Sequence, residues 1–302
     1  MDDFGIRSLH VTSKKEVPEA IADLLPLQTS RRKMLLGERT LIMGIINVTP
    51  DSFSDGGRFD VPERAVEEGI RMVEEGADIL DIGGESTRPG SDPVPAEEER
   101  RRVIPVIRAL AKRIDLPLSV DTMKAAIARE ALAEGAEIVN DVSAMNFDGQ
   151  MAKVIADTGA AVVLMHMRGT PKAMQQGDLT YRYLRGEIID FLRKRIERAA
   201  DEGIDPAQIM VDPGIGFGKT VTDNMRLIRY LQEFKVLGRP ILVGPSRKAF
   251  IGQVTGGSPR ERVEGTAAVV TAAILNGGNV IRVHDVSIMK KVAAMADAVS
   301  RA

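Results

Sequence analysis

Eight short apolar runs recur along the chain, and each is followed by a residue that can hydrogen-bond or carry charge. The runs lack the alternation of half-exposed strands and are typical of strands buried on both faces of a parallel sheet. They cover residues 41–46, 79–80, 118–120, 138–139, 161–165, 209–211, 241–243 and 280–281. The polar residues that follow them are Asn47, Asp81, Asp121, Asn140, His166, Asp212, Ser246 and Arg282.

Amphipathic stretches with helix character separate most of these runs. They cover residues 62–75, 96–113, 124–134, 149–157, 181–202, 222–233, 259–276 and 286–300. A strand, loop and helix repeated eight times predict an α/β fold, the (β/α)₈ TIM barrel, in which catalytic groups lie at the carboxyl ends of the strands. Long connections at 48–61, 83–95 and 167–180 would lie at that end and form lids or specificity loops.

Residues 1–36 do not fit the repeat, so we expect a short N-terminal extension followed by one barrel domain over 37–302. Within this region, 18–25 has the pattern of a short helix, and 33–42 suggests a hairpin centred on Gly37-Glu38-Arg39. We expect the extension to cover the amino end of the barrel.

Composition narrows the function classes. The 302 residues suit one large α/β domain. Forty-one basic and 43 acidic residues give a net charge of -2, with no long run of one sign, which argues against nucleic acid or a membrane as partner. The absence of cysteine excludes disulfides and thiolate chemistry. No signal peptide or membrane-spanning stretch is evident, so a cytoplasmic location is expected.

Residues 47–57, after the first run, combine two carboxylates with amide and hydroxyl groups. Asn47 ends a buried strand, where its amide must meet a backbone group, a ligand or a metal ion. Asp51 and Asp55 have an equal alternative as side chains that stabilise turns.

Residues 81–90, after the second run, place hydroxyl groups and Arg88 behind two glycines. This composition suits an anion or a carboxylated substrate. The alternatives are an exposed surface arginine at 88 and a role for Asp81 in tying loop amides together.

Three strand ends offer hydrogen-bond acceptors to one pocket: Asp121, Asn140 and Asp212. A neutral ring with N–H donors would satisfy them. Capping of the following helix is a rival role for Asp121. The glycines of residues 212–219 allow close backbone approach, but the segment is not a dinucleotide fingerprint, because no helix opens at the required spacing.

The last two runs are followed by basic groups. Ser246-Arg247-Lys248 leads toward a helix, whose first N–H groups favour negative charge. Arg282 and His284 are two residues apart, so they lie on one face of a strand. Together they predict a cationic rim at the usual phosphate position of this fold. His166 has a weaker case and is alternatively a structural histidine.

These segments, taken together, closely resemble the dihydropteroate synthase family over residues 41–295. The matching motifs are 47–57, 81–90, 119–122, 164–167, 212–219, 246–248 and 282–285. Several such motifs in this order are more specific than any one of them. Residues 1–36 are not covered, and Pro245 departs from the residue that the family more often has there.

The resemblance implies a transferase of folate biosynthesis that joins 6-hydroxymethyl-7,8-dihydropterin pyrophosphate to p-aminobenzoate and releases pyrophosphate, and that is a sulfonamide target. It implies that the pterin is held by Asp121, Asn140, Met165, Asp212 and Lys248. It implies that pyrophosphate is held by Asn47, Thr87, Arg282 and His284, with Mg²⁺ on Asn47. It places p-aminobenzoate against Phe53, Thr87, Arg88, Pro89, Phe217 and Ser246. The catalytic groups it implies are Asp121, Lys248, Arg282 and His284.

Two other functions remain as alternatives. A pterin-dependent methyltransferase resembles this barrel and shares an acceptor pocket, but it needs no anion rim. A paralogue that binds pterin without reacting would have the same polar residues.

The helix from 260 to 276 becomes almost wholly apolar after Glu264, which indicates a deeply internal helix or a subunit contact. The resemblance implies a homodimer, and we expect its contact near residues 260–276 and 286–300.

Overall fold

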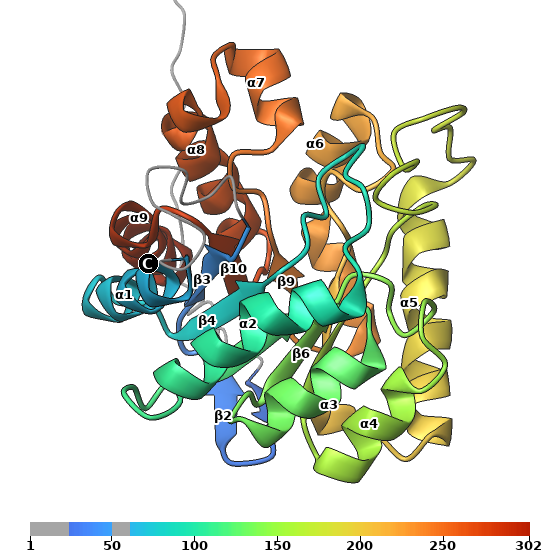
Figure 1. Cartoon of the computed structure of the whole chain (residues 1–302). Coiled ribbons are helices and arrows are strands. Elements are labelled where there is room, and N and C mark those ends of the chain that lie inside the picture. The colour runs from blue at the N-terminus through green and yellow to red at the C-terminus, as the bar shows by residue number, and fades with distance from the viewer. Residues whose placement is uncertain (1–23, 50–60) are drawn as a thin grey trace, which may run out of the picture.

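The computed structural model of the protein describes residues 24–49 and 61–302. Its main sheet has eight strands, all parallel (Figure 1). They are, in chain order, β3 (Leu41–Asn47), β4 (Ile79–Gly83), β5 (Leu118–Asp121), β6 (Ile138–Asp141), β7 (Ala161–Met165), β8 (Ile209–Asp212), β9 (Leu242–Val243) and β10 (Val280–Val283).

The sheet closes into a barrel. Its strands pair in the order β8-β7-β6-β5-β4-β3-β10-β9, and a parallel bridge between Val211 and Ile241 joins the two ends. The α-helices are α1 (Val61–Glu74), α2 (Ala96–Leu110), α3 (Ala125–Ala133), α4 (Met151–Thr158), α5 (Leu184–Asp201), α6 (Val221–Arg229), α7 (Ala249–Thr255), α8 (Val263–Leu275) and α9 (Val286–Arg301). The TIM-barrel prediction is confirmed.

The predicted helices differ from the observed ones in the last third of the chain. The stretch predicted at 222–233 is α6 followed by the 3-10 helix η3 (Leu231–Leu237), and that at 259–276 is η4 (Pro259–Glu261) followed by α8. Helix α7 was not among the predicted helices. It has seven residues and contains Gly252, and a short helix with an internal glycine has little helical signal.

The alternation of side chains along the strands sorts the core into two parts. Ile42 of β3 belongs to the large cluster between the strands and the helices. The next residue, Met43, belongs to a smaller cluster inside the barrel. Because successive side chains point to opposite faces of a strand, Asp81 lies inside the barrel while its neighbours Leu80 and Ile82 face the helices.

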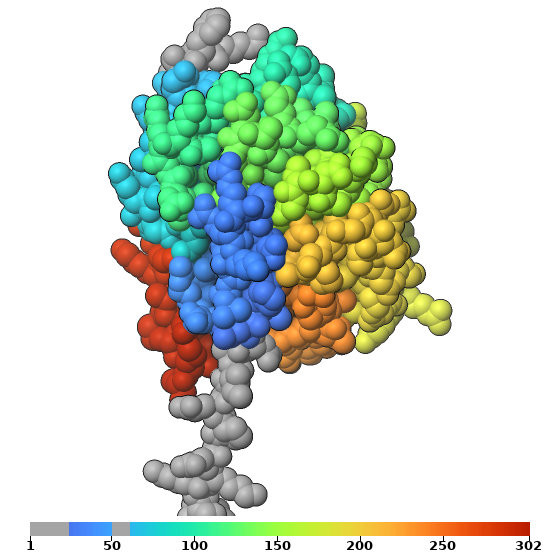
Figure 2. Space-filling model, turned by 90° about the horizontal axis from the view of Figure 1, so that it is seen from below, coloured from blue at the N-terminus to red at the C-terminus, as the bar shows by residue number. Residues whose placement is uncertain are grey.

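A two-stranded antiparallel hairpin, β1 (Leu25–Gln28) and β2 (Lys33–Leu36), lies across the amino end of the barrel. Figure 2 shows it, in blue, on this face between the helices. Leu27 and Leu36 are fully or almost fully buried in the inner cluster, together with Ile79. The hairpin therefore fills the end of the barrel opposite the strand-end polar groups.

The predicted position of this hairpin was wrong. Its turn lies at residues 29–32, where Thr29 Oγ1 accepts hydrogen bonds from the backbone N–H groups of Arg31 and Arg32. Gly37, with φ of 122°, belongs to the connection into β3. The helix predicted at 18–25 lies mostly outside the described residues, and Leu25 begins a strand. Within residues 24–49 and 61–302, no helix is both long and apolar enough to cross a membrane.

Candidate active site

All predicted site residues that the structure describes line one pocket at the carboxyl ends of the strands. They are Asn47, Thr87, Arg88, Pro89, Asp121, Asn140, Met165, Asp212, Phe217, Ser246, Lys248, Arg282 and His284. The cavity has a volume of about 2000 Å³, above the roughly 300–1,000 Å³ that is usual for a single small-molecule site. It therefore has room for two substrates side by side. Phe53, Asp51 and Asp55 lie outside the described residues.

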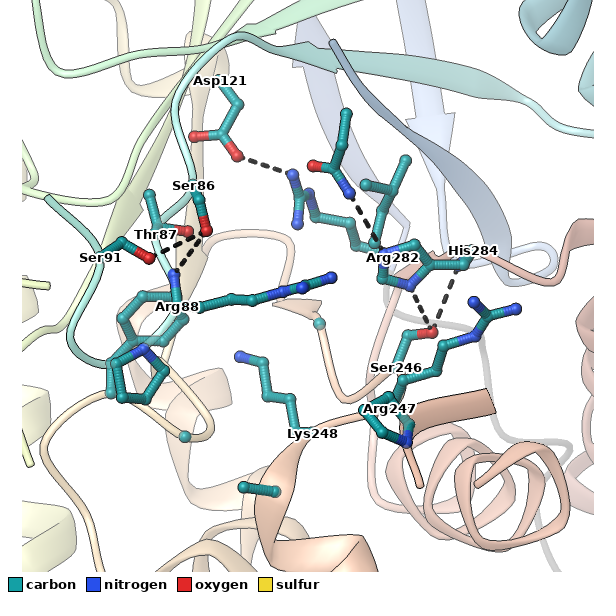
Figure 3. A pocket seen from close by; sticks show the side chains of 18 of the residues that line it. Ser86, Thr87, Arg88, Ser91, Asp121, Ser246, Arg247, Lys248, Arg282 and His284 are labelled. Atoms are coloured by element: carbon teal, nitrogen blue, oxygen red, sulfur yellow. Dashed lines mark hydrogen bonds and ion pairs between the residues drawn. The ribbon is translucent and has the colours of Figure 1, made fainter. Parts of the chain in front are cut away.

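Arg282 lies at the centre of a buried ionic cluster contributed by several strands. Its Nε donates to Asp81 Oδ2 at 2.6 Å, and its Nη2 donates to Asp121 Oδ2 at 2.7 Å (Figure 3). The Asn140 amide donates to the same Asp81 oxygen at 2.9 Å. One guanidinium thus compensates two buried carboxylates, since Asp81 is 0% and Asp121 is 7% exposed.

This cluster rules out the alternative roles of both carboxylates. Asp81 accepts from side chains of β6 and β10, so it does not serve to tie loop amides together. Asp121 does not cap α3, whose N-cap residue is Lys124. Asp81 Oδ1 is buried without a hydrogen-bond partner in the described part of the chain.

Burial raises the pKa of Asp121, and the positive charge of Arg282 opposes this shift only in part, because the negative charge of Asp81 adds to it. The carboxyl group of Asp121 therefore holds a proton more readily than an exposed aspartate. A carboxyl group that can be either protonated or ionised suits the ring nitrogens of a heterocycle, which both donate and accept hydrogen bonds.

Asp212 ends β8 and holds the glycine-rich segment after it. Its Oδ1 accepts from the Gly214 N–H at 2.6 Å, and burial raises its pKa. A Cβ at Gly214 would come within 1.9 Å of the carbonyl oxygen of His166. The first glycine of this motif is therefore required by close packing against the end of β7.

Lys219 is a buried structural group that the sequence analysis did not single out. Its Nζ donates to Phe217 O at 2.9 Å and His166 Nδ1 at 3.0 Å, with a longer contact to His166 O at 3.4 Å. Three acceptors match the three protons of an ammonium group. The sequence did contain one signal for Lys219: it ends a glycine-rich segment that follows a buried strand. Few other residues of that segment have side chains that can reach inward.

His166 is a structural histidine, which was the alternative interpretation of this residue. Burial is the main cause that lowers its pKa, to about 2, and the neighbouring charge of Lys219 adds to it. The ring packs edge-on against Phe191, with centroids 5.0 Å apart. Together with Lys219, it joins β7 to the segment that carries Phe217.

Lys248 reaches into the pocket from the loop before α7. Its Nζ donates to the carbonyl oxygen of Ile215 and lies 4.3 Å from the centroid of the Phe217 ring. Burial of the ammonium group lowers its pKa to about 8, although Asp212 opposes the shift. An ammonium close to Asp212 and over an aromatic face is placed to contact a flat ligand stacked there.

Ser246, His284 and Asn47 form a chain of polar contacts along one wall of the pocket. Ser246 Oγ lies 2.9 Å from His284 Nδ1, and Asn47 Nδ2 lies 3.4 Å from His284 Nε2. When the Asn47 amide donates to Nε2, the neutral imidazole carries its proton on Nδ1 and donates it to Ser246. The Ser246 hydroxyl proton is then available to a ligand.

The expectation of a positively charged His284 does not hold for this geometry. Burial lowers its pKa to about 3, and the charges of Arg247 and Arg282 add to the shift. His284 is therefore a neutral hydrogen-bonding group, and the described cations of the predicted rim are Arg247, Lys248 and Arg282. Arg88 adds a further cation to the pocket. Figure 3 shows the Arg88 side chain extending into the pocket from the loop after β4.

An ion-paired cluster that the sequence did not predict holds the loop after β4. Lys124 forms ion pairs with Glu85 in this loop and with the fully buried Glu99 of α2. Within the loop, Ser86 Oγ accepts a hydrogen bond from the Ser91 hydroxyl at 3.0 Å. These contacts tie the loop that carries Thr87 to the barrel.

Asn47 is the residue that the resemblance implies as a ligand for Mg²⁺. Its amide nitrogen faces His284, and its Oδ1 has no hydrogen-bond partner among the described residues. Mg²⁺ retains several waters and is commonly bound through substrate phosphates with one or two protein oxygens. The described residues contain no group of three or more His, Cys, Asp or Glu that could hold a metal ion. Asn47 therefore fits an ion that a diphosphate brings with it.

Comparisons with known proteins agree with this geometry. The model of the family described as "Pterin binding enzyme" matches residues 43–284. The dihydropteroate synthase of Synechocystis sp. is 47% identical over 278 residues, which cover 91% of this chain and 96% of the relative.

Two solved structures have closely similar folds. The structure of Xanthomonas albilineans dihydropteroate synthase with 4-aminobenzoic acid has a TM-score of 0.85 at 45% identity and covers 91% of this chain and 98% of its own. The Yersinia pestis dihydropteroate synthase in a sulfonamide complex has a TM-score of 0.87 at 41% identity, with 92% and 100% covered. The chain therefore belongs to the pterin-binding enzymes and, within them, to the dihydropteroate synthase family.

Proposed function

We propose that this protein condenses 6-hydroxymethyl-7,8-dihydropterin pyrophosphate with p-aminobenzoate to give 7,8-dihydropteroate and pyrophosphate. The observation that carries the proposal is the union, in one pocket, of buried acceptors with the cations Arg282 and Lys248. Acceptors suit the N–H groups of a pterin, and cations suit a departing diphosphate.

The pterin would lie among Asp121, Asn140 and Asp212, with Met165 packed against the ring and Lys248 donating to it. All three acceptors are at most 7% exposed. The carboxylate oxygens that do not already accept from Arg282 or Gly214 therefore need a partner when water is displaced. The amide N–H of Asn140 donates a hydrogen bond to Asp81, which leaves the carbonyl oxygen of Asn140 to accept from the ligand. The buried site would therefore select a ring rich in N–H donors.

The diphosphate would lie beside Asn47, Thr87, Arg282 and His284. The amino group of p-aminobenzoate attacks the pterin methylene carbon, the carbon–oxygen bond to diphosphate breaks, and the amine loses a proton. Because the arylamine is already nucleophilic, the main requirement is stabilisation of the departing charge, which fixed cations and N–H donors provide. Arg282 is held in place by Asp81 before substrate arrives.

When bound on Asn47, Mg²⁺ would neutralise part of the charge on the departing diphosphate. The p-aminobenzoate ring would lie between Phe217 and the loop with Thr87, Arg88 and Pro89. Its carboxylate would meet the Ser246 hydroxyl, and Phe53 remains a predicted contact. A sulfonamide would compete for the same place, in keeping with the Yersinia pestis complex.

Incubation of the protein with the pterin pyrophosphate, p-aminobenzoate and Mg²⁺ tests this function directly. We expect release of pyrophosphate that depends on both substrates, and inhibition by a sulfonamide that more p-aminobenzoate relieves. A pterin-binding paralogue without activity would bind the pterin and release nothing. A methyltransferase would show no dependence on p-aminobenzoate.

We further propose a homodimer formed through α8 and α9. Along α9, Ile288, Val292, Met295 and Val299 recur at spacings of four, three and four residues, which places them on one face. Met295 is 65% and Val299 54% exposed, an unusual exposure for such a stripe. The division into an extension (1–36) and a catalytic barrel (37–302), and a cytoplasmic location, remain predictions.

A further inference from the structure

Arg247, between two proposed substrate-contacting residues, has a backbone conformation that its side chain disfavours. Its φ is 56°, and only Ala144 and Met145 share a positive φ among the non-glycine residues described. The Lys248 N–H donates to Pro245 O at 3.3 Å, so Arg247 is the third residue of a tight turn. This position with positive φ favours Gly or Asn. An arginine there is strained and persists only where surrounding contacts hold it.

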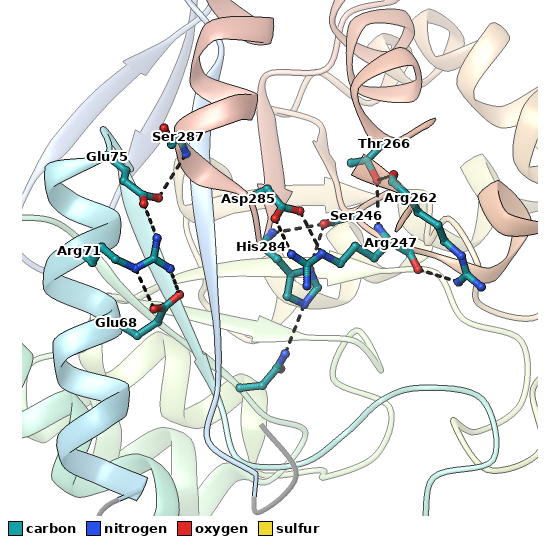
Figure 4. A network of polar contacts seen from close by, with 11 residues as sticks. Glu68, Arg71, Glu75, Ser246, Arg247, Arg262, Thr266, His284, Asp285 and Ser287 are labelled. Carbon is teal, nitrogen blue, oxygen red and sulfur yellow. Dashed lines mark hydrogen bonds and ion pairs between the residues drawn. The ribbon is translucent and has the colours of Figure 1, made fainter. Parts of the chain in front are cut away.

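Residues at the starts of α8 and α9 supply those contacts, as Figure 4 shows. Thr266 of α8 is 0% exposed, and its Oγ1 accepts from the Arg247 N–H at 3.2 Å. Arg262, which precedes α8, donates to the Arg247 carbonyl oxygen at 3.0 Å. Asp285, which precedes α9, forms a two-point ion pair with the Arg247 guanidinium, including Nε to Oδ2 at 3.0 Å.

The turn at Arg247 places the side chains of Ser246 and Lys248 in different parts of the pocket. Ser246 Oγ contacts the His284 ring at 2.9 Å and also accepts from the His284 backbone N–H at 3.3 Å. Lys248 instead reaches Ile215 and the face of Phe217. A relaxed turn at Arg247 would rotate both side chains away from these places.

We propose that Thr266 and Asp285 are positioning residues: they hold Arg247 in its left-handed conformation and so direct Ser246 and Lys248 into the substrate pocket. Neither residue needs to touch substrate for this role. The proposal extends the proposed function, because it assigns to the starts of α8 and α9 the control of the p-aminobenzoate and pterin sides of the site.

The test compares two threonines of one helix. Thr266→Val removes the acceptor for the Arg247 N–H, and Thr271→Val is its matched control. Both hydroxyls donate to the carbonyl four residues earlier, at 2.7 Å to Arg262 and 2.9 Å to Ala267. We expect Thr266→Val to raise the KM for p-aminobenzoate and to lower kcat, each about fivefold, as loss of one hydrogen bond allows. Thr266→Ser should restore both values, and Thr271→Val should leave both unchanged.

A second substitution, Asp285→Asn, weakens the ion pair from the other helix. We expect the same loss of kcat and rise of KM, and less than additive losses in the double variant with Thr266→Val, because both act on one turn. If Thr266→Val only lowers the midpoint of thermal unfolding, as Thr271→Val would, with KM and kcat intact, the proposal is overturned.

A measurement without substrate separates this proposal from the proposed function. The chain has three histidines, so the ring nitrogen NMR signals of His284 can be assigned. They report on its contact with Ser246. We expect these signals to move in Thr266→Val and to keep their wild-type positions in Thr271→Val and Thr266→Ser. Unmoved signals in Thr266→Val would overturn the positioning role even if the wild-type protein proved inactive in the condensation assay.

Discussion

At the scale of single residues, the pocket is built around charges that compensate one another before any ligand arrives. Arg282 joins the carboxylates of Asp81 and Asp121, and Lys219 satisfies acceptors on two neighbouring segments. Buried charges are stable only when they are paired and hydrogen-bonded. The same groups are therefore needed both for folding of the strand ends and for binding, and single substitutions must be chosen to separate the two effects.

Asp212→Ala should lower pterin affinity at least tenfold, because a charge-assisted hydrogen bond to a buried donor contributes about 1.5 to 3 kcal/mol. Isothermal titration calorimetry with the pterin measures this. Asp212→Asn is the matched control. Its amide oxygen can still accept from the Gly214 N–H, so it keeps the loop contact and removes only the charge. Unchanged affinity in the alanine variant would reject the role of Asp212.

Arg282→Ala should reduce turnover about a hundredfold, as loss of a fixed donor to a developing anion does. It should also destabilise the fold by about 3 to 5 kcal/mol, because it leaves two buried carboxylates without their cation. Denaturant unfolding and steady-state kinetics measure the two effects. A second substitution, Asp81→Asn, should recover stability but not turnover. Recovery of both would argue against a role for Arg282 with the leaving group.

His166 gives a prediction for pH. Its pKa of about 2 in the folded chain lies below the unfolded value of about 6.5, so its contribution to stability is present above pH 6.5 and lost as pH falls. His166→Asn retains an acceptor for Lys219 without this titration. The difference in unfolding free energy between wild type and variant should shrink by up to about 1.4 kcal/mol per pH unit below 6.5. Denaturant curves that stay equally spaced from pH 7.5 to 5 would contradict it.

At the scale of elements, the hairpin β1–β2 closes the amino end of the barrel, and the pocket lies at the opposite end. Its inward residues Leu27 and Leu36 meet the first residues of several strands, among them Ile79 and Val280. Thr29 and Arg32 tie its turn to the buried Glu137 before β6. The hairpin therefore stabilises the strand order from the end that carries no pocket residues.

Leu27→Ala should lower the free energy of unfolding by about 2 to 5 kcal/mol, since a fully buried leucine is replaced by a cavity. Leu35→Ala on the neighbouring strand is the control. Leu35 is 52% exposed, and its loss should change stability by no more than about 0.5 kcal/mol. Chemical denaturation measures both. We expect kcat at 25 °C to be unchanged in each, because the pocket lies at the opposite end.

The elements show how much of the structure the sequence could predict. Buried parallel strands are continuous apolar runs, so even the two-residue strand β9 was found. The turn at Thr29 was missed because it contains no Gly, Pro, Asn or Asp, and Gly37 offered a false signal. Partners far apart in sequence were also missed: Asp121 and Asp81 both pair with Arg282 of β10. No local pattern encodes which strand-end groups pair across the barrel.

At the scale of the whole molecule, α8 lies in the outer ring of helices, and the proposed subunit contact would account for its apolar residues. The helix is not deeply internal: Val270 and Ala273 are buried, while Leu275 is 45% exposed. It packs against α9, whose exposed stripe continues the apolar surface. The starts of these two helices contact the turn at Arg247, so the proposed subunit contact and the pocket lie on the same pair of helices.

Met295→Glu should convert the proposed dimer to monomers, because it places a charge in the middle of the apolar stripe of α9. Sedimentation equilibrium should give about twice the chain mass of 32.8 kDa for wild type and the single chain mass for the variant. Val236→Glu is the control, since Val236 is 69% exposed on η3, which packs beside α5. A monomeric wild type, or equal dissociation by the control, would contradict the proposed interface.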